Sequence, residues 1–168
     1  GCRGGGLGAV SVWQAFPTRV AHARGCNALV YSRRGHGRSV PLPSPHEVDF
    51  MHAEALDVLP ALLDSVGIPK PVLFGHSSGA SIALIHAGGS NRRVAGIVAM
   101  APHVIVEDLT VRSIAAARDA YRTTDLPEKL ARHHPDPDAC FTSWTNIRLN
   151  PGFRTWNIAS HLSRIPSP

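Results

Sequence analysis

The sequence has few of the residues that mark disulfide-rich, zinc-binding or membrane-spanning proteins. Its three cysteines, Cys2, Cys26 and Cys140, are too widely spaced for a disulfide framework or a set of zinc ligands. Reduced thiols are the default in the cytoplasm, so we expect a cytoplasmic protein. The sequence contains no apolar run long enough to cross a membrane, and its glycine-rich start lacks the apolar core of a signal peptide. A membrane partner is therefore not expected.

Acidic residues are fewer than basic ones, which leaves a formal net charge of +5 at pH 7. The excess comes from arginines, which are scattered along the chain instead of forming a tract or alternating with aromatic residues. Surfaces that bind nucleic acids usually concentrate their positive charge. The pattern therefore indicates an ordinary solvated surface, and we expect no nucleic-acid partner.

Strand and helix patterns alternate through the first part of the chain. Short apolar runs predict strands over residues 28–31, 71–74 and 93–100, and the run 71–74 is expected to be buried on both faces. Helical spacing predicts helices over residues 12–24, 50–66 and 78–87. Pro17 is expected in the first turn of the first helix, Gly25 at its end, and Gly88 and Gly89 at the end of the third. This alternation is typical of an α/β fold, here a three-layer α/β/α arrangement with a mainly parallel sheet between helices. Sites in such sheets lie beyond the carboxyl ends of the strands.

The sequence after Met100 favours helices. Prolines and an Asn-Pro pair break residues 101–163 into several helical segments, and no strand pattern appears there. Phe141 and Trp144 belong to this part of the chain. They could line an apolar binding pocket, or they could hold the helices together.

The segment Gly75–Gly79 reads GHSSG, a G-x-S-x-G motif between a predicted strand and a predicted helix. In that context the serine occupies a sharp, strained turn that exposes its hydroxyl, which predicts Ser77 as a nucleophile. A side chain at Gly75 or Gly79 is expected to collide with neighbouring backbone. The Ser78 N–H, at a helix N-terminus, is predicted to stabilise an oxyanion. The alternative is a tight turn that only joins two elements.

Two further segments precede this motif: Gly6–Gly8, and Tyr31–Ser39 with the sequence YSRRGHGRS. In this order the segments resemble the α/β-hydrolase family. The resemblance implies that Leu7 supplies a second oxyanion N–H, because a backbone donor does not depend on its side chain. The chain departs from the family pattern at Gly5, where a histidine is usual, and at Ser32, where many members have aspartate. No metal or organic cofactor is implied.

The resemblance also implies a domain organisation. Residues 1–102 would form a partial α/β-hydrolase core, residues 103–163 a helical cap, and residues 164–168 the start of a return to the core. Family members have strands before the first motif, and a catalytic acid and histidine after a segment like the one that ends at Pro168. We therefore expect an internal fragment or truncated product that is inactive alone.

His103 is the best candidate for a base within the chain itself. It follows the predicted strand 93–100, so it falls near the edge that carries Ser77. Glu107 or Asp108 could orient it. The alternative is that His103 is a hinge residue and Asp108 caps a helix.

Some members of this family use an aspartate nucleophile for other reactions, whereas residue 77 here is serine. The resemblance therefore implies a small-molecule substrate with a carbonyl group, namely a carboxylic ester, thioester or lactone. Two alternatives remain open. One is hydrolysis of a carbon–carbon bond, and the other is a catalytically incomplete, hydrolase-like ligand-binding module. The adjacent His133 and His134 lack the spacing of metal ligands, so no metal site is expected.

Overall fold

The computed structural model describes residues 7–166. The chain folds into two compact units: the first comprises Gly1–Pro45 and Ile114–Asn146, and the second comprises His46–Ser113 and Ile147–Pro168. The division into a core of residues 1–102 and a cap of residues 103–163 stays a prediction.

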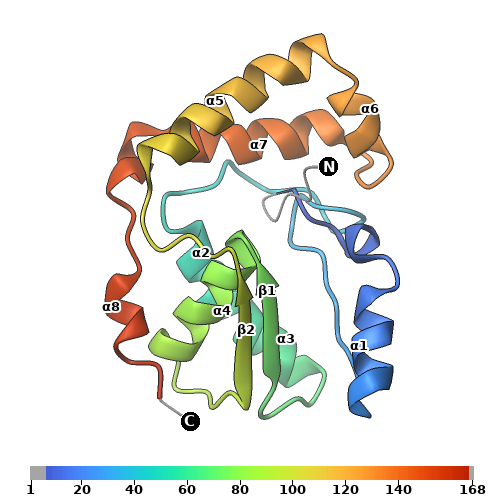
Figure 1. Ribbon diagram of the computed structural model, residues 1–168, viewed down its shortest axis with the longest axis vertical. Coiled ribbons are helices and arrows are strands. Elements are labelled where there is room, and N and C mark those ends of the chain that lie inside the picture. The colour runs from blue at the N-terminus through green and yellow to red at the C-terminus, as the bar shows by residue number, and fades with distance from the viewer. Residues whose placement is uncertain (1–6, 167–168) are drawn as a thin grey trace. The chain divides into compact units, whose positions relative to one another are not determined.

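The second unit is built on a parallel pair of strands, β1 (Val72–His76) and β2 (Gly96–Met100). Their register pairs Val72 with Gly96 and His76 with Met100, so both carboxyl ends lie at the same edge. Helix α4 (Ser78–Gly89) connects them and runs beside them (Figure 1). The predicted strand–helix–strand order is confirmed, although β2 starts later than the pattern indicated.

Helix α4 forms the centre of this unit because nearly all of its residues are buried. It packs against both strands and also against α2 (Phe50–Ala53), the π-helical turn η2 (Glu54–Val58) and α8 (Ala159–Leu162). The turn η2 comes just before Pro60, in α3 (Leu59–Ser65), and proline has no N–H for an α-helical bond. The fully buried His86 of α4 donates from Nδ1 to the Ala55 carbonyl in η2, at 2.8 Å.

The two faces of β1 differ. Leu73 and Gly75 are buried, whereas Val72 is 64% exposed and Phe74 is 38% exposed. The expectation that this apolar run is buried on both faces is therefore wrong. The strand alternates instead, with one face against α4.

The end of α4 shows a second difference. Gly88 and Gly89 were expected to terminate the helix, but they are its last two helical residues, and Ser90 follows in an extended conformation. A Cβ at Gly88 would lie 2.0 Å from the His161 carbonyl oxygen of α8. These glycines therefore allow close packing of two helices.

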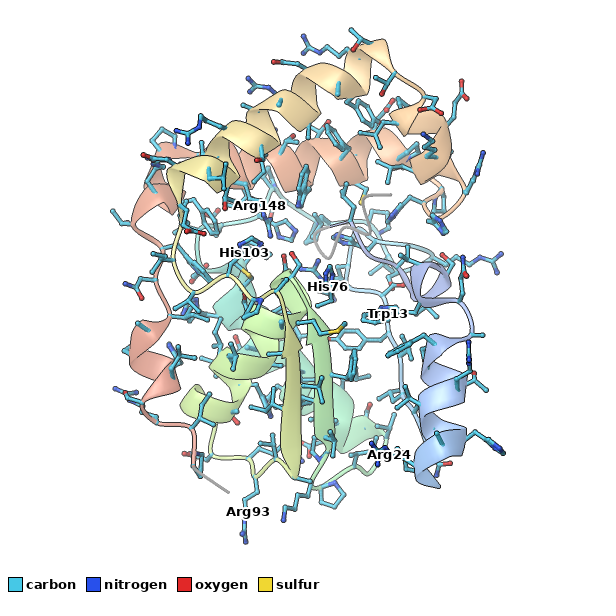
Figure 2. All side chains as sticks on the ribbon, viewed as in Figure 1. Trp13, Arg24, His76, Arg93, His103 and Arg148 are labelled. Atoms are coloured by element: carbon cyan, nitrogen blue, oxygen red, sulfur yellow. The ribbon has the colours of Figure 1, made fainter. Side chains whose placement is uncertain are left out.

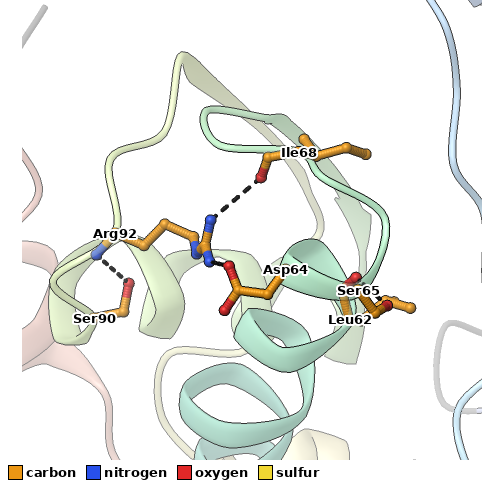
Figure 3. A network of polar contacts seen from close by, with 6 residues as sticks. All are labelled: Leu62, Asp64, Ser65, Ile68, Ser90 and Arg92. Carbon is orange, nitrogen blue, oxygen red and sulfur yellow. Dashed lines mark hydrogen bonds and ion pairs between the residues drawn. The ribbon is translucent and has the colours of Figure 1, made fainter.

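A polar network lies just beyond the C-terminal end of α4 (Figure 3). The Arg92 guanidinium pairs with Asp64 of α3 and donates to the Ile68 carbonyl at 3.3 Å, and the Arg92 backbone N–H donates to the Ser90 hydroxyl at 3.2 Å. The network joins the segment after α4 to the turn before β1.

A short 3₁₀ turn, η3 (Pro151–Thr155), lies in the same unit, and the side chain of its N-cap residue Asn150 accepts a hydrogen bond from Gly152 N–H.

The first unit contains a short 3₁₀ turn, η1 (Val10–Trp13), and helix α1 (Phe16–Arg24), so the single helix expected over residues 12–24 is divided. Pro17 lies in the first turn of α1, and Gly25 ends it with φ of 60°, as the sequence indicated. Residues 28–31 form no strand. An apolar run becomes a strand only with a hydrogen-bonded neighbour, and the described sheet has only β1 and β2.

The helices predicted after Met100 are confirmed as α5 (Asp108–Thr123), α6 (Leu126–Ala131), α7 (Pro137–Leu149) and α8. In the first unit, Tyr121 of α5 stacks on Phe141 of α7 with ring centroids 3.9 Å apart, and Trp144 lies 5.6 Å from Phe141. Because Phe141 is 3% exposed, it contributes to the packing between these helices.

Candidate functional site

Ser77 lies at the turn between β1 and α4 with φ of 54° and ψ of −121°. Few non-glycine residues adopt positive φ, and such strain persists only where the surroundings hold it. Here the Ser77 N–H donates to the Met100 carbonyl at 2.9 Å, and the Ser77 carbonyl accepts from Ala80 N–H at 2.9 Å and Ser81 N–H at 3.1 Å. The sheet and the first turn of the helix therefore fix the strained serine from both sides.

The two glycines of the motif have different roles. A Cβ at Gly75 would lie 2.4 Å from the Gly79 carbonyl oxygen and 2.6 Å from Ala80 N, so only glycine fits there. A Cβ at Gly79 would meet nothing within 4 Å. The expectation of a clash at Gly79, the second residue of α4, is therefore wrong, because a side chain there would have open space.

The structure brings Ser77 together with His103. Strand β2 ends at Met100, Ala101 turns the chain with φ of 47°, and the His103 side chain approaches the turn that carries Ser77. Its Nε2 lies 3.3 Å from Ser77 Oγ, within hydrogen-bond reach. Figure 2 shows His76, His103 and Arg148 around the carboxyl ends of the two strands. The edge predicted for a site thus carries a serine and a histidine in contact.

The environment of His103 favours its neutral form. Burial lowers the pKa of its imidazole below the usual 6.5, and the positive charge of Arg148 lowers it further. The carboxylate of Glu107 acts in the opposite direction, and His76 adds to the lowering. A neutral imidazole can accept a proton from a hydroxyl, so His103 is suited to the role of a base near neutral pH.

Arg148 is a buried cation beside the Ser77 turn, and no sequence pattern predicted it. It is 5% exposed, its Nη2 donates to Ser78 Oγ, and its guanidinium lies 5.7 Å from the centre of the Phe50 ring. A lone arginine in a helix forms no motif, so only the folded structure could reveal this position.

The two acids named with His103 differ in their surroundings. Asp108 forms an ion pair with Arg154. Asp108 is the first residue of α5, so it lies within the first turn of that helix. Glu107 instead interacts electrostatically with His103 and stabilises its charged form. Of the two, Glu107 is the acid that affects His103.

Leu7, Phe141 and Trp144 belong to the first unit, and their predicted roles stay predictions. The Leu7 carbonyl accepts a hydrogen bond at 3.0 Å from Nε2 of the buried His134, whose Nδ1 accepts from Gly37 N–H at 3.0 Å. His134 thus joins two of the motif segments. Gly5 and Gly6, like Cys2, lie outside the described residues.

Within residues 7–166, no group of three or more His, Cys, Asp and Glu side chains is arranged to hold a metal ion. No helix in that range is both long and apolar enough to span a bilayer.

A parallel strand pair, a serine at a strained strand–helix turn and a histidine shortly after the next strand come together in this α/β unit. A family model described as "Alpha/beta hydrolase family" matches residues 2–164. The chain belongs to the α/β-hydrolase family, and the recognised motifs and the α/β fold agree with that membership. A comparison with curated proteins gave no match.

Proposed function

We propose that this protein is a serine hydrolase that cleaves a carboxylic ester, thioester or lactone through an acyl-enzyme on Ser77. The observation that supports this most directly is the 3.3 Å separation between Ser77 Oγ and His103 Nε2. A serine hydroxyl is a weak nucleophile until a neighbouring base takes its proton. His103, whose surroundings favour its neutral form, is the base that we assign to it. With a base inside the chain, we propose activity for the chain itself, in place of the inactive fragment that the family resemblance led us to expect.

In the first half-reaction the Ser77 hydroxyl proton passes to His103 Nε2 while Oγ bonds to the substrate carbonyl carbon. The carbonyl oxygen becomes an oxyanion. When the intermediate collapses, the bond to the leaving group breaks and the proton on Nε2 passes to that group, which departs as an alcohol or thiol. In a lactone the leaving alcohol stays attached to the acyl chain.

In the second half-reaction a water molecule gives a proton to His103 Nε2 and its oxygen attacks the acyl carbon. The carbon–Oγ bond then breaks, and the proton returns to Ser77. The product is a carboxylic acid, and the serine is restored. His103 carries one proton in each half-reaction.

The oxyanion forms next to the N-terminus of α4, a twelve-residue helix that begins at Ser78. The partial positive charge of a helix N-terminus stabilises a neighbouring anion. We assign the Ser78 N–H as one donor to that oxygen, because it belongs to the residue after the nucleophile. Loss of one such donor typically lowers kcat by about 100- to 1,000-fold.

A fluorophosphonate probe and p-nitrophenyl esters test this proposal on the full chain. We expect covalent labelling that is lost in Ser77→Ala, and ester hydrolysis that is lost in Ser77→Ala and falls strongly in His103→Gln. Ser65→Ala is a matched control, because Ser65 is an exposed helical serine that donates to the Leu62 carbonyl at 2.8 Å. No labelling of the folded protein would exclude the function. Labelling that persists in His103→Gln at the same rate would keep the nucleophile and exclude His103 as its base.

A further inference from the structure

We infer that Ser81 is a positioning residue that holds His103 against Ser77. This inference rests on the proposed function. It concerns the backbone of residue 103, which a single buried hydroxyl binds at both its N–H and its carbonyl.

The contacts of Ser81 are unusual for a serine within a helix. Its Oγ accepts a hydrogen bond from His103 N–H at 2.9 Å and donates one to the His103 carbonyl at 2.7 Å. The Ser77 carbonyl is also near, but at 3.4 Å it is the weaker acceptor for the single hydroxyl proton. Helical serines usually donate to the carbonyl four residues earlier. Here the hydroxyl instead binds a segment that follows the next strand.

These bonds close a short loop of contacts around the proposed reaction centre. Ser81 lies one helical turn after Ser77, and its N–H donates to the Ser77 carbonyl at 3.1 Å. Its hydroxyl binds the backbone of His103, and the His103 ring returns to Ser77 Oγ at 3.3 Å. The nucleophile and the anchor of its base therefore sit on the same rigid turn of α4. A shift of His103 along the helix would break both hydroxyl bonds.

Ser81 is 0% exposed, so water cannot replace its hydroxyl without rearrangement. In a Ser81→Ala variant the N–H and the carbonyl of His103 would lose their hydrogen-bond partner in a poorly hydrated place, which favours movement of the segment. The neighbouring residues have anchors of their own. The Val104 carbonyl accepts from Ile158 N–H at 2.9 Å, and Ile105 forms a bridge with Asn157. The segment should therefore stay folded without Ser81 while the histidine loses its alignment.

The test compares Ser81→Ala with Ser81→Thr, which keeps a hydroxyl, and with Ser65→Ala as the control. We expect kcat for ester hydrolysis to fall about 10- to 100-fold in Ser81→Ala with little change in KM, because a misplacement of about 1 Å has effects of this size. Ser81→Thr should recover part of kcat. Wild-type kcat in Ser81→Ala, or a loss expressed only in KM, would overturn the inference.

A second measurement does not depend on turnover. The ring ¹⁵N resonances of His103, assigned with His103→Gln, should shift when Ser77→Ala removes the hydroxyl beside Nε2. In the Ser81→Ala background the same substitution should have little effect, because the ring has already moved. Equal shifts in both backgrounds would refute the positioning role even if the protein proved inactive. Failure of the proposed function would appear separately, as absence of probe labelling in the wild-type protein.

Discussion

Gly75 and Gly79, on either side of the Ser77 turn, give a sharp prediction, because the motif treats them alike and the structure does not. Alanine at position 75 places Cβ 2.4 Å from the Gly79 carbonyl oxygen and 2.5 Å from the Gly79 carbonyl carbon. Both are backbone atoms of the first turn of α4, so no side chain can rotate away. Strand and helix must separate by about 1 Å to restore ordinary contact in a close-packed interior.

Forced expansion of a packed interior costs about 1–3 kcal/mol, and a clash with backbone falls at the upper end of that range. We therefore expect Gly75→Ala to lower the free energy of unfolding by about 3 kcal/mol. Alanine at position 79 meets nothing within 4 Å and replaces glycine inside a helix. That change should raise the free energy of unfolding by about 0.5–1 kcal/mol.

Urea denaturation of both variants, followed by far-ultraviolet circular dichroism, measures the difference. The midpoint should fall in Gly75→Ala and rise slightly in Gly79→Ala, and probe labelling of Ser77 should survive only in the second. Equal losses in the two variants would show that both glycines are required for the same reason. An unchanged midpoint in Gly75→Ala would refute the close approach of β1 and α4 at this turn.

Three further predictions concern charge and buried polar groups. The positive charge of Arg148 lowers the pKa of His103, so Arg148→Gln should raise that pKa. The acidic limb of the pH profile for probe labelling of Ser77 should therefore move to higher pH. An unmoved limb would contradict the electrostatic effect of Arg148 on His103. Burial, and then the neighbouring His161, lower the pKa of His52 in the folded protein. Its contribution to stability is therefore complete above the ordinary value of 6.5 and is lost as the pH falls below that value and through the lowered pKa of the folded state. Urea midpoints on either side of that pH should differ less in His52→Phe than in the wild type, and an equal difference would argue against His52. His134→Ala leaves the Gly37 N–H and the Leu7 carbonyl without their imidazole partner. Each unpaired group should lower the free energy of unfolding by about 1–3 kcal/mol. Hydrogen exchange in residues 7–45 that matches the wild type would contradict this prediction.

The local features of the site could be predicted from the sequence. The motif Gly75–Gly79 between an apolar run and a helical pattern predicted the turn, because the steric demands of a sharp strand–helix junction act on neighbouring residues. The same local reasoning failed for the strand expected at residues 28–31. A strand depends on hydrogen bonds to another segment, and the composition of an apolar run does not show whether such a segment lies beside it. Arg148 and Ser81 were missed for a related reason, because each acts through a contact with a residue far away in sequence.

The approach of His103 to Ser77 shows how far such reasoning reaches. Parallel pairing of β1 and β2 brings the residues after both strands to one edge, and this much follows from the order of elements. The orientation of the imidazole requires two further facts. Ala101 adopts a positive φ that alanine rarely takes, and the hydroxyl of Ser81 holds the backbone two residues later. An alanine gives no sequence signal for a left-handed turn, and a serine within a helix gives none for a remote hydrogen bond. A sequence argument could therefore place His103 at the correct edge, but it could not distinguish a base from a hinge residue.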